Sequence, residues 1–197
     1  MSTDAHPLGL ASGRVIIMPY DPRWVVEFQN AERELRLALG SAALAVHHVG
    51  STAVPGLCAK PVLDLLVSVP DLAASLQFVS KLEALDYEFR PHEDISDRHF
   101  FRRRRGAKRT HHLSLAEPTS HFHKATLAFR DALRQDPAKA REYAELKLML
   151  ARRFPGDREK YLEGKTAFVA RVLREAGLEH LPDRTIPACG DDTCSLK

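Results

Sequence analysis

One acidic residue inside an apolar run constrains the fold of this chain more than any other feature. Residues 62–69 read Val-Leu-Asp-Leu-Leu-Val-Ser-Val and lie between Pro61 and Pro70, so the run is long enough for a strand and too short for a helix. The pattern predicts a buried central strand that contains Asp64. Because a buried carboxylate is destabilising unless it is paired, hydrogen-bonded or bound to a metal, Asp64 has either a structural partner or a chemical role.

A glycine-serine turn precedes this strand. Residues 43–49 predict another buried strand, and Gly50, Ser51 and Thr52 follow it directly. Glycine permits a positive φ and the close approach of another group, while the two hydroxyls lie beside backbone amides, so this turn can hold a phosphate. A Gly-Ser turn after one strand is a weak signal by itself, and Asp64 on the next strand makes it more specific.

These residues carry a resemblance to a known family. The string from His48 to Leu65, His-Val-Gly-Ser-Thr-Ala-Val-Pro-Gly-Leu-Cys-Ala-Lys-Pro-Val-Leu-Asp-Leu, is very similar to the signature of the GrpB family, a branch of the nucleotidyltransferase superfamily. The resemblance covers about residues 14–176. Its other landmarks follow in order: Pro19-Tyr20-Asp21-Pro22-Arg23-Trp24, His99-Phe100-Phe101-Arg102, Thr110-His111-His112-Leu113, Ala128-Phe129-Arg130-Asp131, Tyr143-Ala144-Glu145-Leu146-Lys147 and Phe154-Pro155-Gly156-Asp157-Arg158.

The resemblance implies a fold and an activity. The expected fold is α/β (α+β), a nucleotidyltransferase-like mixed β-sheet flanked by helices, with a C-terminal helical cap. The expected reaction is the Mg²⁺-dependent transfer of a nucleoside monophosphate from a nucleoside triphosphate, expected to be ATP, to an unidentified small-molecule acceptor. In this scheme Gly50, Ser51 and Thr52 hold phosphate, Asp64 ligates the metal, and Lys60 neutralises charge.

The superfamily pattern is incomplete at one position. The superfamily places a second acid two residues after the first, and here that position is Leu66, which cannot bind a metal. A single Mg²⁺ on Asp64 remains open, with water and substrate phosphates as its other ligands. Two alternatives also remain: a catalytically degenerate nucleotide-binding, accessory or folding module, and an ATP-dependent ligase that uses the same pocket.

A basic hairpin follows in the second half of the chain. Residues 98–115 predict a β-hairpin whose tip surrounds Gly106, with six basic residues between positions 102 and 109. No aromatic platform or reading helix accompanies this charge, so the sequence argues against nucleic acid as a partner. Basic side chains are common on solvent-exposed hairpin edges, yet an inward-facing Arg102 or Arg104 could reach a triphosphate.

The return strand of this hairpin supplies a candidate base. Alternation sends Leu113 and Leu115 to the core and His112 and Ser114 to the opposite face. The superfamily has its third acid on an equivalent strand, so His112 is a candidate general base or metal ligand. A hydrogen-bonded structural histidine is an equally open interpretation.

The other elements are predicted from helical spacing and cap residues. Residues 15–18 predict a short edge strand, and a helix follows from Asp21 to Gly40. A second helix begins at Pro70 with Leu72, Leu76, Val79, Leu82 and Leu85 inward, and the polar stretch from Pro91 to Asp97 predicts a flexible loop. The last third is helical, with helices that begin at Ser120, at Asp136 and at Asp157, the last of which runs to Ala176.

Two lysines in this helical last third are further candidates. Tyr143 with Lys147, and Tyr161 with Lys165, are four residues apart, so each pair shares one helix face. A lysine stem that lies along a packed tyrosine is the structural interpretation. Because both positions recur in the family that the chain resembles, we expect Lys147 and Lys165 to hold a small anionic substrate.

Length and charge set the remaining expectations. The 197 residues suit one domain at 14–178, between a flexible N-terminus at 1–13 and a flexible tail at 179–197. The net charge of +3 is small, no apolar run is long enough for a membrane helix, and the first residues lack a secretion signal, which together predict a cytoplasmic protein without a membrane partner. The sequence gives no oligomeric state.

Overall fold

The fold is a mixed β-sheet with helices on both sides and a group of helices at one end. The computed structural model describes residues 6–11, 14–91 and 97–178. Within these residues the strands are β1 (Leu10–Ala11), β2 (Ala45–Val49), β3 (Leu63–Ser68), β4 (Tyr87–Phe89), β5 (His99–Arg105) and β6 (Lys108–Ala116). The strand order is β2-β3-β6-β5-β4, and β1 pairs with the start of β6. β3 and β6 are parallel and every other pairing is antiparallel, so the predicted mixed sheet is confirmed.

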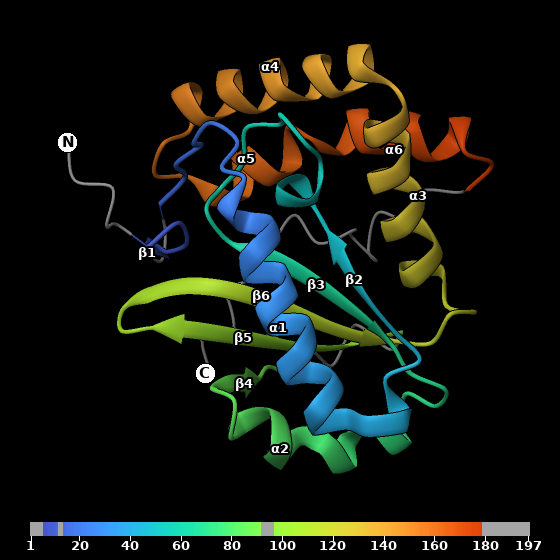
Figure 1. Cartoon of the computed structure of the whole chain (residues 1–197). Helices are drawn as coiled ribbons and strands as arrows, with labels where there is room; N and C mark the ends of the chain where they lie inside the picture. The colour runs from blue at the N-terminus through green and yellow to red at the C-terminus, as the bar shows by residue number, and fades with distance from the viewer. Residues whose placement is uncertain (1–5, 12–13, 92–96, 179–197) are drawn as a thin grey trace, which may run out of the picture.

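The helices occupy three positions around the sheet (Figure 1). The helices are α1 (Arg23–Leu39), α2 (Val79–Glu83), α3 (His121–Gln135), α4 (Pro137–Arg153), α5 (Arg158–Glu163) and α6 (Thr166–Glu175), with 3₁₀ segments η1 (Gly40–Ala42), η2 (Ser51–Ala53) and η3 (Ala74–Phe78). α1 runs along the sheet, α2 lies at one end, and α4, α5 and α6 gather at the other end. No helix of the described segments has the length and hydropathy to cross a membrane.

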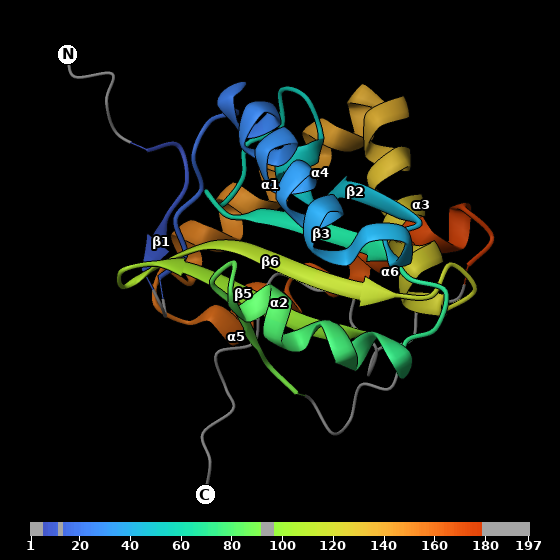
Figure 2. The same ribbon diagram turned by 60° about the horizontal axis from the view of Figure 1, so that its bottom comes forward.

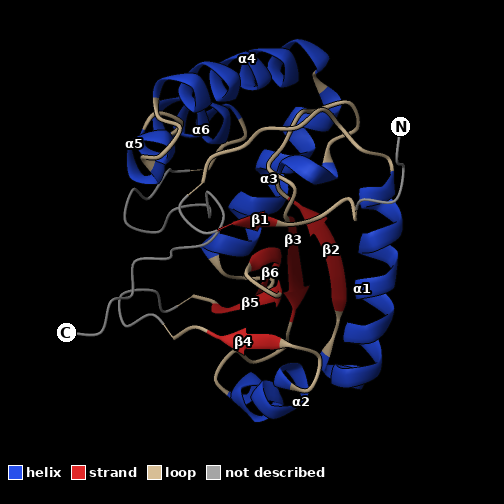
Figure 3. Ribbon diagram, turned by 90° about the vertical axis from the view of Figure 1, so that its left-hand side faces the viewer, coloured by secondary structure: helices blue, strands red, loops and turns tan. Residues whose placement is uncertain are grey.

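Alternation along β3 and β6 gives the sheet one apolar face. Leu65 and Val67 of β3 and Leu113 and Leu115 of β6 are at most 2% exposed and pack with α1 and α2 in the main core. Figure 3 shows α1 along this side of the sheet. Because neighbouring residues on a strand point to opposite faces, Asp64 and His112 face away from this core.

A second core joins the C-terminal helices to the loop between β2 and β3. Val54 and Leu57 of that loop pack among buried residues of α3, α4 and α6. The helix starts that the sequence predicts at Ser120, Asp136 and Asp157 are confirmed, since each side chain accepts hydrogen bonds from backbone amides of the first turn. The C-terminal helices therefore cover the end of the sheet and also position the loop that follows the Gly50-Ser51-Thr52 turn.

Two predicted helices differ from the structure. The helix expected from Pro70 through Leu85 is a 3₁₀ segment followed by the short α2, and the tighter turn leaves Leu76 45% exposed instead of inward. The helix expected from Asp157 to Ala176 is divided into α5 and α6 at Gly164. A Cβ at Gly164 would overlap the Leu150 side chain, so α4 packs against the chain where the two helices meet.

The N-terminal segment also differs in detail. The edge strand expected at residues 15–18 is wrong except at Met18, which makes an isolated bridge with Ala59. β1 lies instead within the segment predicted as flexible. The first helix begins at Arg23, with Pro22 as its N-cap residue and Asp21 accepting a hydrogen bond from the Arg23 amide. Most of the predicted loop between Pro91 and Asp97, and the predicted tail at 179–197, lie outside the described residues.

Candidate functional site

The turn after β2 lies directly against the buried carboxylate. Gly50 has φ +69°, a conformation that favours glycine, and a Cβ at this position would overlap Oδ2 of Asp64. Val49, the last residue of β2, is the register partner of Asp64 on β3. The pairing of β2 with β3 thus brings together the two halves of the motif that the sequence singled out.

Four polar residues form a row across four strands on the same face of the sheet. Asp64 of β3 is the register partner of His112 on β6, His112 that of Arg102 on β5, and Arg102 that of Glu88 on β4. The Asp64 Oδ1 to His112 Nδ1 distance is 3.0 Å, and the Arg102 Nη2 to Glu88 Oε2 distance is 3.2 Å. Asp64, His112 and Arg102 are three separate candidates in the sequence, and the register of the sheet makes them neighbours.

His112 is held as a neutral imidazole. Burial lowers its pKa, against the opposing effect of the hydrogen bond and charge of Asp64. Since a carboxylate only accepts hydrogen bonds, Nδ1 carries the proton and Nε2 keeps its lone pair. This buried Nε2 has no hydrogen-bond partner among the residues that the structure describes. The pair therefore has the arrangement of a general base whose orientation is fixed by a carboxylate.

Three lysines surround a small cavity beside Asp64. Ser51, Lys60, Lys147 and Lys165 line a space of about 30 Å³, together with the ring of Tyr161. The other residues that line it are Thr52, Ala59, Val62 and Asp64. This volume is roughly that of one water molecule, so a larger ligand requires movement of the surrounding side chains.

The turn holds Lys147 in place, while Lys60 and Lys165 lie over an aromatic ring. Lys147 is 2% exposed and donates hydrogen bonds to Ser51 Oγ, at 3.0 Å, and to the carbonyl oxygen of Cys58. The ammonium groups of Lys60 and Lys165 lie 4.3 and 4.8 Å from the centroid of the Tyr161 ring. In each tyrosine-lysine pair of the sequence the lysine ammonium lies over the ring of its own tyrosine, 4.7 Å from the centroid for Lys147 and 4.8 Å for Lys165, and both lysines line the cavity.

Sequence reasoning missed the groups that fix the backbone of the turn. Arg130 donates to the carbonyl oxygen of His48 at 3.1 Å, and Arg134 donates to that of Ala53 at 2.9 Å. His48 contacts Thr52 Oγ1 through Nε2 at 2.9 Å, and burial lowers its pKa to about 4. Arg130 belongs to a motif that resembles the family, which was an available signal, while Arg134 had none.

The carboxylates that a two-metal site would need are absent from this motif. Leu66, at the second acid position, is fully buried in an apolar cluster with Val49, Ala116 and Phe122. Ser114 is on the strand where the superfamily has its third acid, and its hydroxyl accepts a hydrogen bond of 3.4 Å from Arg98. Across residues 6–11, 14–91 and 97–178, no three His, Cys, Asp or Glu side chains converge to hold a metal. Asp64 is the carboxylate of this motif that lines the cavity, so a hard cation bound there would need phosphate and water as its other ligands.

Comparison with known proteins identifies relatives over most of the chain. A family model described as GrpB protein matches residues 14–175. The UPF0157 protein PA4798 of Pseudomonas aeruginosa is 42% identical over 83% of this chain and 68% of its own. A shorter match, 40% identical, joins 42% of this chain to 22% of a Dephospho-CoA kinase of Mycolicibacterium paratuberculosis.

The solved structures include one similar protein and one distant match. The crystal structure of the conserved protein GrpB from Enterococcus faecalis has a TM-score of 0.76 and 35% identity, and the match covers 82% of this chain and 96% of that one. Cid1 poly(U) polymerase matches 76% of this chain and 49% of its own with a TM-score of 0.42 and 14% identity. The Cid1 match is too distant to assign a role to any residue here.

Proposed function

Since the chain belongs to the GrpB family, whose model covers nearly all of its described residues, we propose that it binds a nucleoside triphosphate beside Asp64 and transfers a nucleoside monophosphate to a small acceptor. The observation that carries the proposal is the Asp64–His112 pair placed against the Gly50 turn. In this arrangement a turn that can hold phosphate, a carboxylate and an oriented base lie together at one point of the sheet.

The charge around the cavity supports an anionic substrate. Lys60, Lys147 and Lys165 line it with a single carboxylate, that of Asp64. Three ammonium groups around one carboxylate favour a ligand with several negative charges, such as the phosphates of a nucleotide. Lys60 and Lys165 rest on Tyr161 through long, flexible stems, so they can move apart to admit a ligand larger than the present cavity.

The chemistry follows from the protonation state of His112. Nε2 accepts the proton of an acceptor hydroxyl, the hydroxyl oxygen forms a bond to the α-phosphorus, and the bond from that phosphorus to the bridging oxygen breaks, releasing pyrophosphate. Asp64 accepts the hydrogen bond from Nδ1, which keeps that proton on the imidazole, and its negative charge stabilises the imidazolium that forms. A Mg²⁺ ion bound by Asp64 and the substrate phosphates would offset the negative charge that develops on the leaving group.

Calorimetric titration of each nucleoside triphosphate, with and without Mg²⁺, tests the binding step. We expect one nucleotide to bind the native protein with Mg²⁺ and to lose at least about tenfold in affinity in Asp64→Asn and in Lys165→Gln. Lys160→Gln is the matched control, because Lys160 is an exposed lysine of α5 that pairs with Asp157 and does not line the cavity. Binding that is equal in all four proteins, or absent from the native protein, would contradict the proposal.

A second candidate function is binding without transfer, which Leu66 favours. A fully buried leucine at the second acid position removes the donor that a two-metal transfer reaction uses. The short match to part of a Dephospho-CoA kinase suits an accessory module of this kind. Release of pyrophosphate from the bound nucleotide in the presence of an acceptor panel separates the two: release that depends on His112 supports transfer, and tight binding without release supports the module.

A further inference from the structure

A larger cavity lies on the opposite face of the sheet from Asp64. His111 and His112 are neighbours on β6, so their side chains point to opposite faces, and His111 lines a cavity of about 670 Å³ between α1 and the β5–β6 hairpin. Figure 2 shows the hairpin running beside β3. A volume of this size is typical of pockets for small molecules.

The two walls of this cavity carry opposite charge. α1 contributes Glu27 and Glu34, while the hairpin contributes Arg103, Arg104 and Arg105. Two lining residues are exceptions: Arg33 is a positive charge on the α1 wall, and Asp86, next to β4, is a negative charge outside that wall. The separation of carboxylates on the helix wall from guanidinium groups on the hairpin wall remains the main electrostatic feature.

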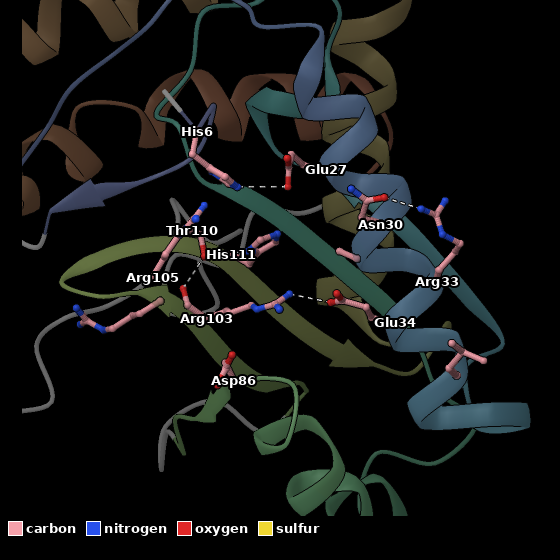
Figure 4. A pocket seen from close by; sticks show the side chains of 13 residues that line it. His6, Glu27, Asn30, Arg33, Glu34, Asp86, Arg103, Arg105, Thr110 and His111 are labelled. Carbon is pink, nitrogen blue, oxygen red and sulfur yellow. Dashed lines mark hydrogen bonds and ion pairs between the residues drawn. The ribbon is translucent and has the colours of Figure 1, made fainter. Parts of the chain in front are cut away.

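An existing ion pair shows that the walls are close enough for one charged group to reach the other. Arg103 extends from the hairpin to Glu34 on α1, with Nη1 and Oε2 2.8 Å apart (Figure 4). Near the other end, Glu27 faces His6, whose Nε2 lies 3.7 Å from Oε2. Between these two contacts, a ligand with one anionic and one cationic group can satisfy both walls at once.

The base of the cavity is polar but uncharged. Burial lowers the pKa of His111 to about 3, so its imidazole is neutral at physiological pH. Its Nδ1 lies 3.0 Å from the hydroxyl of Thr110, and Ala31 of α1 adds an apolar surface. The charged ends of a ligand therefore belong on the walls, and its uncharged middle belongs on this base.

We propose that this cavity binds a small zwitterion of the amino-acid or short-peptide class. Its ammonium group lies against Glu27, and its carboxylate lies against the guanidinium groups of the hairpin, including Arg105. The site is independent of the nucleotide reaction proposed above, because the sheet separates it from Asp64 and His112.

The test uses glycyl-leucine and its two end-blocked forms, in the absence of nucleotide. Titrations of the full-length protein are followed by calorimetry and by the NMR signals of the Thr110 and His111 amides. We expect saturable binding of glycyl-leucine, weakened by about tenfold or more by N-acetylation or by C-terminal amidation, which is the loss typical of one charge-assisted hydrogen bond.

Variants of the two walls test which wall binds the ammonium group of the ligand and which binds its carboxylate. In Glu27→Gln we expect acetylation to make no further difference, and in Arg105→Gln we expect amidation to weaken binding less than it does in the native protein, because Arg103 and Arg104 also line the cavity. Glu32→Gln is the matched control, because Glu32 is on α1, pairs with Arg36 and does not line the cavity, so both blocking effects should keep their native size. The proposal fails if glycyl-leucine shows no saturable binding at millimolar concentration, if the end-blocked forms bind equally well, or if Glu27→Gln leaves the effect of acetylation unchanged.

Discussion

Asp64 and His112 are register partners on the two parallel strands of the sheet, and Oδ1 of the carboxylate accepts a hydrogen bond from Nδ1 of the imidazole, with the two atoms 3.0 Å apart. They are 48 residues apart in sequence, so neither strand alone contains the pair. Burial alone would leave His112 with an even lower pKa, and the carboxylate opposes that effect. The carboxylate therefore sets both the orientation and the basicity of the candidate base.

Asp64→Asn tests this relationship directly. Removing the charge and the charged hydrogen bond should lower the pKa of His112 further, because both interactions raise it in the native protein. A pH titration of the histidine ring nitrogens by NMR measures the change. Ser68→Ala, on the same strand, is the control, since Ser68 contacts His47 and His123 and not His112. A rise in the His112 pKa in Asp64→Asn would overturn this account.

Gly50→Ala tests the packing of the turn against the carboxylate. The added Cβ would overlap Asp64 Oδ2, so we expect a loss of about 2–4 kcal/mol in the free energy of unfolding, from steric overlap added to the cost of a positive φ. Gly106→Ala is the matched control, because Gly106 also has a positive φ, of +58°, but has nothing near its Cβ position. We expect it to lose only about 1–2 kcal/mol. Urea denaturation measures both, and equal losses would show that the contact with Asp64 does not matter.

These residues differ in how far the sequence alone predicts them. Asp64 and the Gly50 turn stood out because an acid in an apolar run and a glycine between strands are local signals. Arg134 gave no such signal, because its hydrogen bond to the Ala53 carbonyl joins residues 81 positions apart. Helical spacing places Leu76 on the inward side, which is wrong because apolar spacing does not separate a 3₁₀ segment from an α-helix.

Lys147→Met tests the structural role of the buried lysine. Methionine keeps much of the apolar stem but leaves Ser51 Oγ and the Cys58 carbonyl without their donor, so we expect a loss of about 2–3 kcal/mol in unfolding free energy. Lys139→Met on the same helix removes a surface ion pair with Glu175 and should cost less than about 1 kcal/mol. Chemical denaturation of the two variants gives the comparison. Similar losses would mean that Lys147 does not hold the turn.

Two buried histidines should make stability depend on pH. The pKa values of His48 and His111 fall from the ordinary 6.5 to about 4 and about 3, so the unfolded chain binds more protons than the folded protein between these limits. The stability that comes from keeping these histidines neutral is present in full above pH 6.5. It is lost as the pH falls toward 4 for His48 and toward 3 for His111, at up to about 1.4 kcal/mol per pH unit for each histidine.

Denaturation curves between pH 7.5 and pH 5 measure this slope, roughly over the range in which His48 and His111 titrate in the unfolded chain and not in the folded protein. His111→Gln removes one titrating group, so its slope should be smaller even if its stability at pH 7.5 changes. An unchanged slope in His111→Gln would show that this residue is not kept neutral by the fold.

Leu66→Asp separates a packed core position from a degenerate metal site. Leu66 is fully buried against Val49, Ala116 and Phe122, so a carboxylate there faces apolar side chains, and we expect a large loss of stability, of several kcal/mol. Leu66→Asn introduces a side chain of similar size without the charge and is the control. If the position belongs only to the core, Mg²⁺ should not raise the melting temperature of Leu66→Asp relative to Leu66→Asn. Selective stabilisation of Leu66→Asp by Mg²⁺ would instead show that a cation bound at Asp64 can reach this position, and it would support a transferase ancestry for the site.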